Sequence, residues 1–462
     1  MLDVGRQQTE HGFGYPRYVE RTFRRSLACG IPSAGLARVK CEACASEHLV
    51  AFSCKQRAVC PSCQARRMAD LAAQLVDSLL PKAPYRQYVF TFPMPLRLAM
   101  FRESAVLSAV LQRTIRALFA QLRRRGKAAG VSSPMPAALT AIQRFGGSLN
   151  INVHFHTVVP DGVFTCETDQ RLRFVPLAPP SDKDIGHLVR TVSRRVARWI
   201  ATHLAERDVV DDDADAWTAQ AIAEAQPPRR PPWLVPLDAP AALPKPRCAE
   251  HEGYTVHAQT ATAASDRQGL EHLLRYCLRA PLAQHRLSLS ADARRVRYRF
   301  ARPWHNGRTH LELEPVAFMR RLALLIPPPR LNLLRYHGLF APRASHRQQL
   351  AALLPTTEHT PQTAAPDPEA GQPVSVPAAP TVQSTVQADH EAQPTPPPQT
   401  TPPSLPPRQR LRWAALLRRV FAIDMVCACG GTLRLIALLN DPEVLTKICD
   451  HLGWPTAAPP LE

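Results

Sequence analysis

The chain has 462 residues, which exceeds one typical domain and predicts two to four. Its formal net charge is +19, and an excess of this size suits a polyanionic partner, either nucleic acid or an anionic membrane surface. No apolar run approaches the roughly 20 residues of a membrane span, and the N-terminus lacks the apolar region of a signal peptide. Membrane association is therefore not favoured, and a bacterial-type cytoplasmic location is expected.

Cysteines dominate the N-terminal region. In a cytoplasmic chain, the twelve cysteines are interpreted as metal ligands or buried thiols rather than as disulfides. Each C-x₂-C turn lets two thiolates approach one ion, and two such turns complete a tetrahedron. The spacing predicts one structural zinc site with these ligands: Cys41, Cys44, Cys60 and Cys63. Cys54 is an alternate ligand, Cys29 and His48 are further candidates, and a second site stays open.

Basic residues accompany these cysteines, which argues against thiols packed in a core. A zinc module that carries basic side chains most often binds DNA or RNA, and protein contacts are the alternative. The candidate DNA contacts are Lys55, Arg57, Arg66 and Arg67.

Farther along, a helix-like segment precedes a β-rich run at 85–97, and residues 138–159 read as two strands around a Gly-Gly-Ser turn. Alternation along the second strand points His154 and His156 to the same face, about 7 Å apart, where they can grip one metal ion or one phosphate. Gln143 lies on the paired strand and is a candidate third ligand of a divalent ion with open coordination positions. The alternatives are two ordinary buried histidines and a surface glutamine.

An amphipathic helix is predicted within residues 265–287, beginning with a capping box of Ser265 and Gln268 and ending before Pro281. Tyr276 lies at the edge of its apolar stripe, and Arg279 follows nearly one turn later. A phenol beside a cation or metal can act as a nucleophile, and an ordinary edge tyrosine is the alternative.

Two stretches differ in composition from the rest of the chain. Residues 208–247 run from acidic to proline-rich and predict an exposed insertion, whereas residues 355–407 cannot form a core and predict disorder. A small C-terminal unit follows, in which Asp441 is predicted to cap a helix that Gly453 ends. Its Cys427 and Cys429 stand one residue apart, so we interpret them as structural thiols rather than zinc ligands.

Five segments occur in an order that closely resembles the rolling-circle insertion-sequence transposases of the HUH superfamily with an N-terminal zinc-binding domain. They are "SCKQRAVCPSCQARR", "FTFP", "QRFGGSLNINVHFH", "RYCLRAPLAQHRL" and "RYHGLFAPRASHR". The resemblance covers about residues 20–347 and the C-terminal unit. It implies an α+β fold: an antiparallel-sheet HUH endonuclease-like core, a zinc-ribbon-like N-terminal domain and a small C-terminal α/β unit after a disordered linker. The expected domains are residues 1–80 (zinc-binding, DNA-recognising), 81–347 (catalytic, with 208–247 exposed), 348–408 (linker) and 409–462.

By matching position, the resemblance implies that His154 and His156 bind a catalytic Mg²⁺ or Mn²⁺ and that Tyr276 is the nucleophile toward single-stranded DNA. His272 stands one turn before Tyr276, so the single-tyrosine type is expected. Arg279 is a candidate for stabilising the phenolate or the phosphate. Expected partners are single-stranded element ends, target DNA and host replication proteins, with a nucleoid location. Two alternatives remain: a decayed, non-catalytic zinc-containing DNA-binding protein, and a metal-dependent phosphodiesterase that uses water.

Overall fold

A computed structural model describes residues 15–166, 171–204, 245–292, 294–301, 303, 307–354, 427, 429–431 and 433–454. The predicted insertion lies outside the described residues except for 245–247, and the predicted linker except for 348–354. No helix of the described part is long and apolar enough to cross a bilayer.

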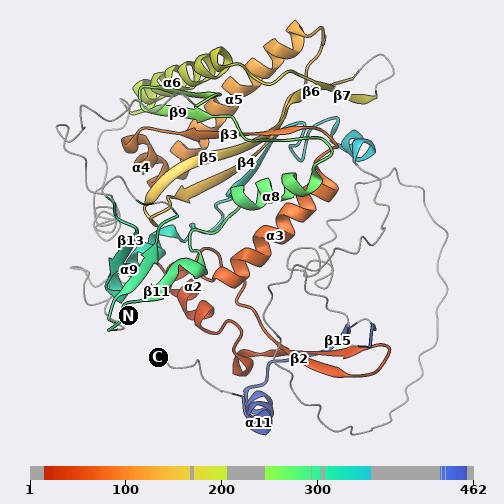
Figure 1. Ribbon diagram of the computed structural model, residues 1–462, viewed down its shortest axis with the longest axis vertical. Coiled ribbons are helices and arrows are strands. Elements are labelled where there is room, and N and C mark those ends of the chain that lie inside the picture. Colours follow the sequence, from red (N-terminus) through yellow and green to blue (C-terminus); the bar gives the residue numbers. More distant parts are fainter. Residues whose placement is uncertain are drawn as a thin grey trace.

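The centre of the molecule is a seven-stranded sheet in which every pairing is antiparallel (Figure 1). The two strands predicted around the Gly-Gly-Ser turn are confirmed and lie next to each other in this sheet. Along the sheet, the strands are β14 (Leu334–Gly338), β4 (Ala137–Phe145), β5 (Ile151–Pro160), β3 (Tyr85–Thr91), β9 (Tyr254–His257) and β8 (Cys248–His251), and β10 (Ala261–Thr262) also pairs with β3.

Helices cover both faces of this sheet, because its central strands are apolar on both sides. One face packs against α4 (Met94–Arg102), α5 (Ser104–Ala128) and α6 (Asp182–Leu204), and the other against α3 (Pro61–Ser78) and α8 (Arg267–Cys277). Along β5, Val153 and Phe155 belong to the core under α4 and α5. By alternation, His154 and His156 face α3 and α8.

A third core joins the peripheral elements near the sheet's lower end. It is built from α2 (Arg17–Leu27), α9 (Pro315–Leu325) and a small sheet of β11 (Leu287–Leu289), β12 (Val296–Arg299) and β13 (His310–Leu313). Further described elements are the antiparallel pair β6 (Gly162–Cys166) and β7 (Leu172–Pro176) and three 3₁₀ turns, η1 (Pro32–Ala34), η2 (Gln284–Arg286) and η3 (Arg347–Leu353).

A buried ion pair fixes the main sheet. Arg86 on β3 donates to both carboxylate oxygens of Asp161 at 2.9 and 2.7 Å, and also to the backbone oxygen of Ala258 at 2.8 Å. It thereby ties β3 to the turn after β5 and to the segment that follows β9.

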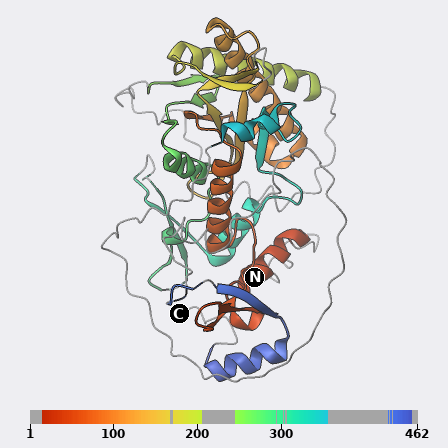
Figure 2. The same cartoon turned by 90° about the vertical axis from the view of Figure 1, so that its right-hand side faces the viewer.

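The described part of the C-terminal unit does not stand apart. Strand β15 (Leu433–Leu439) pairs with β1 (Leu36–Cys41), which also pairs with β2 (Glu47–Ala51), and α11 (Pro442–Leu452) lies beside this sheet (Figure 2). The predicted cap is confirmed, because Asp441 accepts from two backbone amides at the start of α11 and Gly453 ends the helix at φ +63°. The composition of a linker indicates a boundary between units in the sequence, but it does not indicate which part of the fold the following segment will contact.

Helix α3 connects the cysteine-rich region with the main sheet. Helix α3 starts with Pro61 inside the cysteine-rich region, and Leu75 and Val76 near its end pack in the same core as α8. One helix therefore belongs both to the cysteine-rich region and to the main sheet.

Candidate active site and metal centres

The two histidines of β5 lie side by side under α8. His154 is 6% exposed, His156 is 3% exposed, and their ring centroids are 4.9 Å apart. Gln143 on β4 is the direct cross-strand partner of His154, so both side chains share one face. Gln143 is 2% exposed, so the alternative of a surface glutamine is wrong.

Both imidazoles are neutral at physiological pH. Burial, with Arg279 and Arg97 nearby, lowers the pKa of His154 to about 4, although a backbone hydrogen bond opposes the shift. Burial and the neighbouring His154 and Arg279 lower the pKa of His156 to about 3. His154 Nδ1 lies 2.7 Å from the Asn152 carbonyl oxygen, so Nδ1 carries the proton and Nε2 keeps its lone pair.

Gln87 on β3 contacts the second imidazole. Its amide nitrogen lies 2.8 Å from His156 Nδ1 and donates to Cys277 Sγ at 3.1 Å. Burial raises the pKa of Cys277 to about 12, so this thiol stays protonated. Gln87 therefore ties β3 to both His156 and the end of α8.

Two buried atoms on this face have no hydrogen-bond partner among the described residues: His156 Nε2 and the Gln143 amide oxygen. Buried polar atoms usually have a hydrogen-bond partner, so these two atoms would be available to bind a ligand. Together with His154 Nε2 they offer two imidazole nitrogens and one amide oxygen from a single face. This neutral donor set fits a divalent ion that keeps open positions.

Helix α8 presents Tyr276 to these histidines. The Tyr276 and His156 ring centroids are 5.6 Å apart and the rings are nearly perpendicular, at 85°. Gln143 holds the helix end in place, because its amide nitrogen donates to the backbone oxygens of Tyr276 at 3.3 Å and Cys277 at 2.8 Å. Tyr276 is 49% exposed, so a strand arriving from solvent can reach its phenol.

The helix starts differently from the prediction. Asp266, not Ser265, is the cap, and its carboxylate accepts from the backbone amide of Gly269 at 2.7 Å. The helix begins at Arg267, so Ser265 stands one position too early to cap it. His272, one turn before Tyr276, is exposed.

Two arginines lie close to Tyr276 and the histidines. The Arg279 guanidinium carbon lies 4.9 Å from the centroid of the Tyr276 ring, and its Nε has no hydrogen-bond partner in the described part of the chain. Arg97 on α4 donates to the Asn152 side chain at 3.0 Å, next to His154. Sequence reasoning missed Arg97 and Gln87, although a glutamine inside the apolar run at 85–91 is a signal of a buried polar role.

A basic cleft of about 660 Å³ adjoins this site, between α3, β4, β14 and the end of α8. Gln143, Cys277 and Arg279 belong to both. No described residue that lines the cleft is acidic. Five lining residues are arginines: Arg57, Arg67, Arg144, Arg279 and Arg335. Of the predicted DNA contacts, Arg57 and Arg67 therefore lie at the cleft, whereas Lys55 and Arg66 are not among its lining residues.

Among the described residues, eight of the twelve cysteines form two clusters, and within each cluster the four sulfur atoms lie within 4.8 Å of one another. The first cluster is Cys29, Cys54, Cys60 and Cys63. The second cluster is Cys41, Cys44, Cys427 and Cys429. The prediction of one site from Cys41, Cys44, Cys60 and Cys63 is therefore wrong, because these four residues are divided between the clusters. Cys427 and Cys429, interpreted from the sequence as structural thiols, lie beside Cys41 and Cys44. His48 is in neither cluster.

The β1–β2 hairpin explains the division. Cys41 and Cys44 lie at its tip, whereas Cys29 precedes its first strand and Cys54 follows its second. A six-residue strand such as β1 is about 20 Å long, too far for the tip and the base to share one ion.

Two family models match the chain. One, described as "Putative transposase" (Y2_Tnp), covers residues 137–349, and the other, "Transposase zinc-binding domain" (Zn_Tnp_IS91), covers residues 5–92. No curated protein and no solved structure matches. The first match contains the histidines and Tyr276, and the second contains the first cluster. The zinc-binding match and the cysteine clusters support structural zinc, and the two matches in this order support a transposase of the IS91 family, a DNA-cleaving and strand-transferring enzyme.

Proposed function

We propose that the protein is an HUH-type rolling-circle transposase that cleaves and rejoins single-stranded DNA through a 5′-phosphotyrosine at Tyr276. The observation that carries the proposal is the half-exposed Tyr276 ring, 5.6 Å from the buried, neutral His156. A tyrosine with only a structural role on the edge of a helix needs no such neighbour.

The residues that would hold the catalytic metal are His154 and His156 through Nε2 and Gln143 through its amide oxygen. Their two partnerless buried atoms support this assignment. A bound Mg²⁺ or Mn²⁺ supplies Lewis-acid polarisation of a nonbridging oxygen of the scissile phosphate. The single Gln143 side chain would bind the metal and position α8 at once, because its nitrogen already donates to the end of that helix.

Tyr276 carries out the covalent step. Its phenol oxygen attacks phosphorus, the bond from phosphorus to the 3′ oxygen breaks, and the phenol proton passes to solvent while the leaving oxygen takes one up. Arg279 stabilises the phenolate and the phosphate charge. In the second step a 3′-hydroxyl attacks the phosphotyrosine and the phenol is released. The number of phosphoester bonds is conserved, so no nucleotide is consumed.

The basic cleft would carry the DNA strand to this site. Five arginines without a lining carboxylate attract a polyanion, and the shared Arg279 connects the cleft with Tyr276. Each phosphate that is neutralised on a single strand adds about 0.7 to the slope of log affinity against log salt.

The test is incubation of the protein with labelled single strands from the element ends and Mg²⁺ or Mn²⁺, followed by a denaturing gel. A covalent band is expected from the native protein and from Tyr254→Phe on the opposite face of the sheet, but not from Tyr276→Phe. Free 5′-phosphate ends that Tyr276→Phe still produces over many turnovers would instead establish a water-dependent phosphodiesterase. Binding without any cleavage would establish a decayed DNA-binding protein.

A further inference from the structure

The second cysteine cluster is built from the two ends of the chain. Cys44 and Cys427 Sγ are 3.3 Å apart, Cys41 and Cys429 Sγ are 3.5 Å apart, and the first pair is separated by 383 positions. Four sulfurs at about 2.3 Å from one zinc ion would lie about 3.8 Å from each other. The four side chains thus already have the spacing of a closed tetrahedral site.

The backbone around these thiols has the shape that such a site needs. Gly430 has φ +86° and donates to the carbonyl of Cys427, and Ala45, at φ +59°, donates to the carbonyl of Cys41. Each turn therefore points two thiols to the same side. A Cβ on Gly431 would lie 2.5 Å from Cys41 Sγ, so only glycine lets the two turns approach this closely.

Basic side chains lie beside the cluster. Lys40 on β1 is the direct cross-strand partner of Arg434 on β15, one position away from Cys41, and Lys40 also pairs with Glu47 on β2 at 3.7 Å. A zinc ion with four thiolates would carry a net charge of −2, which nearby cations such as Lys40 and Arg434 would stabilise.

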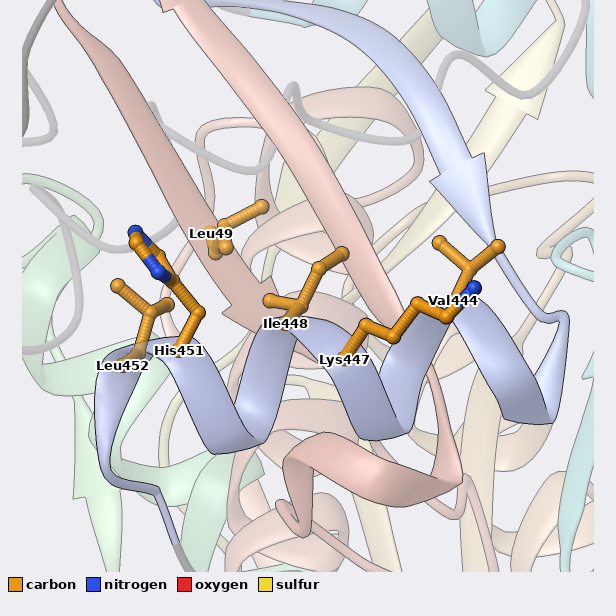
Figure 3. A pocket seen from close by; sticks show the side chains of 6 residues that line it. All are labelled: Leu49, Val444, Lys447, Ile448, His451 and Leu452. Carbon is orange, nitrogen blue, oxygen red and sulfur yellow. The ribbon is translucent and has the colours of Figure 1, made fainter.

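The other contacts of the C-terminal segment are thin. Leu435, Ile436 and Leu438 of β15 are 54%, 48% and 59% exposed. Helix α11 buries Leu445 and Cys449, but an open apolar groove lies between this helix and Leu49 of β2 (Figure 3). In Figure 3, Val444, Ile448 and Leu452 of α11 point toward the neighbouring strands and line this groove. Pairing with β1 also closes a very long loop, which costs chain entropy.

We propose that one zinc ion at Cys41, Cys44, Cys427 and Cys429 clamps residues 427–454 onto the N-terminal sheet, so that β15 pairs with β1 only in the metal-bound protein. Four soft thiolates select zinc over Mg²⁺ or Mn²⁺. Both cysteines of the C-terminal pair lie outside the two matched regions. The proposal does not depend on strand-transfer chemistry.

The test combines zinc content with hydrogen exchange of the full-length, zinc-loaded protein. The native chain should hold two zinc ions, and the double variant Cys427→Ser, Cys429→Ser should hold one. In that variant the amides of 433–439 should exchange at least tenfold faster, whereas those of β5 should not change. Cys248→Ser, a cysteine outside both clusters, is the matched control and should keep both zinc ions. Two zinc ions in the double variant, or unchanged exchange in β15, would overturn the proposal.

Gly431→Ala provides a second variant that keeps every ligand. The added methyl meets Cys41 Sγ, so zinc affinity of one of the two sites should fall at least tenfold and exchange in β15 should rise with it. Gly147→Ala is its control, because nothing lies within 4 Å of the added carbon. Equal zinc affinities in these two variants would count against the clamp.

Discussion

The main sheet is stabilised differently from the cysteine-rich head, by which we mean β1, β2, β15, α11 and the two cysteine clusters. The main sheet is covered by helices on both faces, and its central strands bury almost every side chain. The three-stranded sheet of the head has an exposed outer strand and carries two clusters of four cysteines at its tip and its base. Apolar burial therefore shapes the sheet that carries the histidines, whereas clustered cysteines join the parts of the head.

Removal of zinc should destabilise the head but not the main sheet. We expect this change to have the largest effect on stability. Structural zinc typically contributes apparent binding energies of about 10–16 kcal/mol, so a strong chelator should unfold the head. The main sheet should stay folded. Limited proteolysis with mass mapping should find the first cuts between residues 36 and 60, and cuts within β4 or β5 at the same rate would show that the regions are not independent.

Loss of the buried Arg86–Asp161 ion pair should destabilise the main sheet but not the head. Asp161→Ala leaves the Arg86 guanidinium buried without its carboxylate, so the free energy of unfolding of the main sheet should fall by about 3–5 kcal/mol. The matched control is Glu47→Ala in the head, where the half-exposed pairs with Arg38 and Lys40 should together contribute only about 0–1 kcal/mol. Urea unfolding measures both, and equal losses would contradict the assignment.

Acid should weaken the main sheet through its histidines. The pKa of His154 is about 4 in the folded chain and about 6.5 when unfolded, so the unfolded state binds more protons between these values. Stability that is present above pH 6.5 should therefore decline as pH falls toward 4, by roughly 3 kcal/mol. His154→Asn should flatten this profile in the metal-free protein, and an unchanged slope would exclude His154 as the cause.

The cap of α8 gives the smallest effect. Asp266→Ala should cost about 1 kcal/mol, because the amide of Gly269 loses its acceptor. Ser265→Ala should stay within about 0.5 kcal/mol. Thermal unfolding distinguishes the two, and a larger loss at Ser265 would restore the capping box predicted from the sequence.

The chemical face could be read from the sequence because its information is local. His-Phe-His on a strand fixes a shared side, and a short hairpin brings Gln143 opposite His154. The apolar stripe of α8 predicted Tyr276 at its edge, whereas its place beside those histidines followed only from the family resemblance. The roles of Gln87 and Arg97 were not predicted. Gln87 lies on β3, which pairs with β5 although the two strands are far apart in the sequence, and no turn residue indicates that pairing. Arg97 lies on α4, which follows β3.

The grouping of the cysteines in the head could not be predicted from local sequence. The spacing of the C-x₂-C pairs is as good for one shared ion as for two separate ones, and only the hairpin between them decides. Cys427 and Cys429 lie beyond a long proline-rich stretch, so nothing near them in the sequence indicates Cys41 and Cys44 as partners.

The proposed function rests on covalent attachment of DNA to Tyr276. The most direct measurement is peptide mass mapping of the protein–DNA adduct after nuclease and protease digestion, with Mn²⁺ present during the reaction. The account predicts one modified peptide, with a 5′-linked nucleotide on Tyr276, and its loss when His154 and His156 are replaced by Ala. A nucleotide attached to any other residue, or an adduct that persists without both histidines, would contradict it.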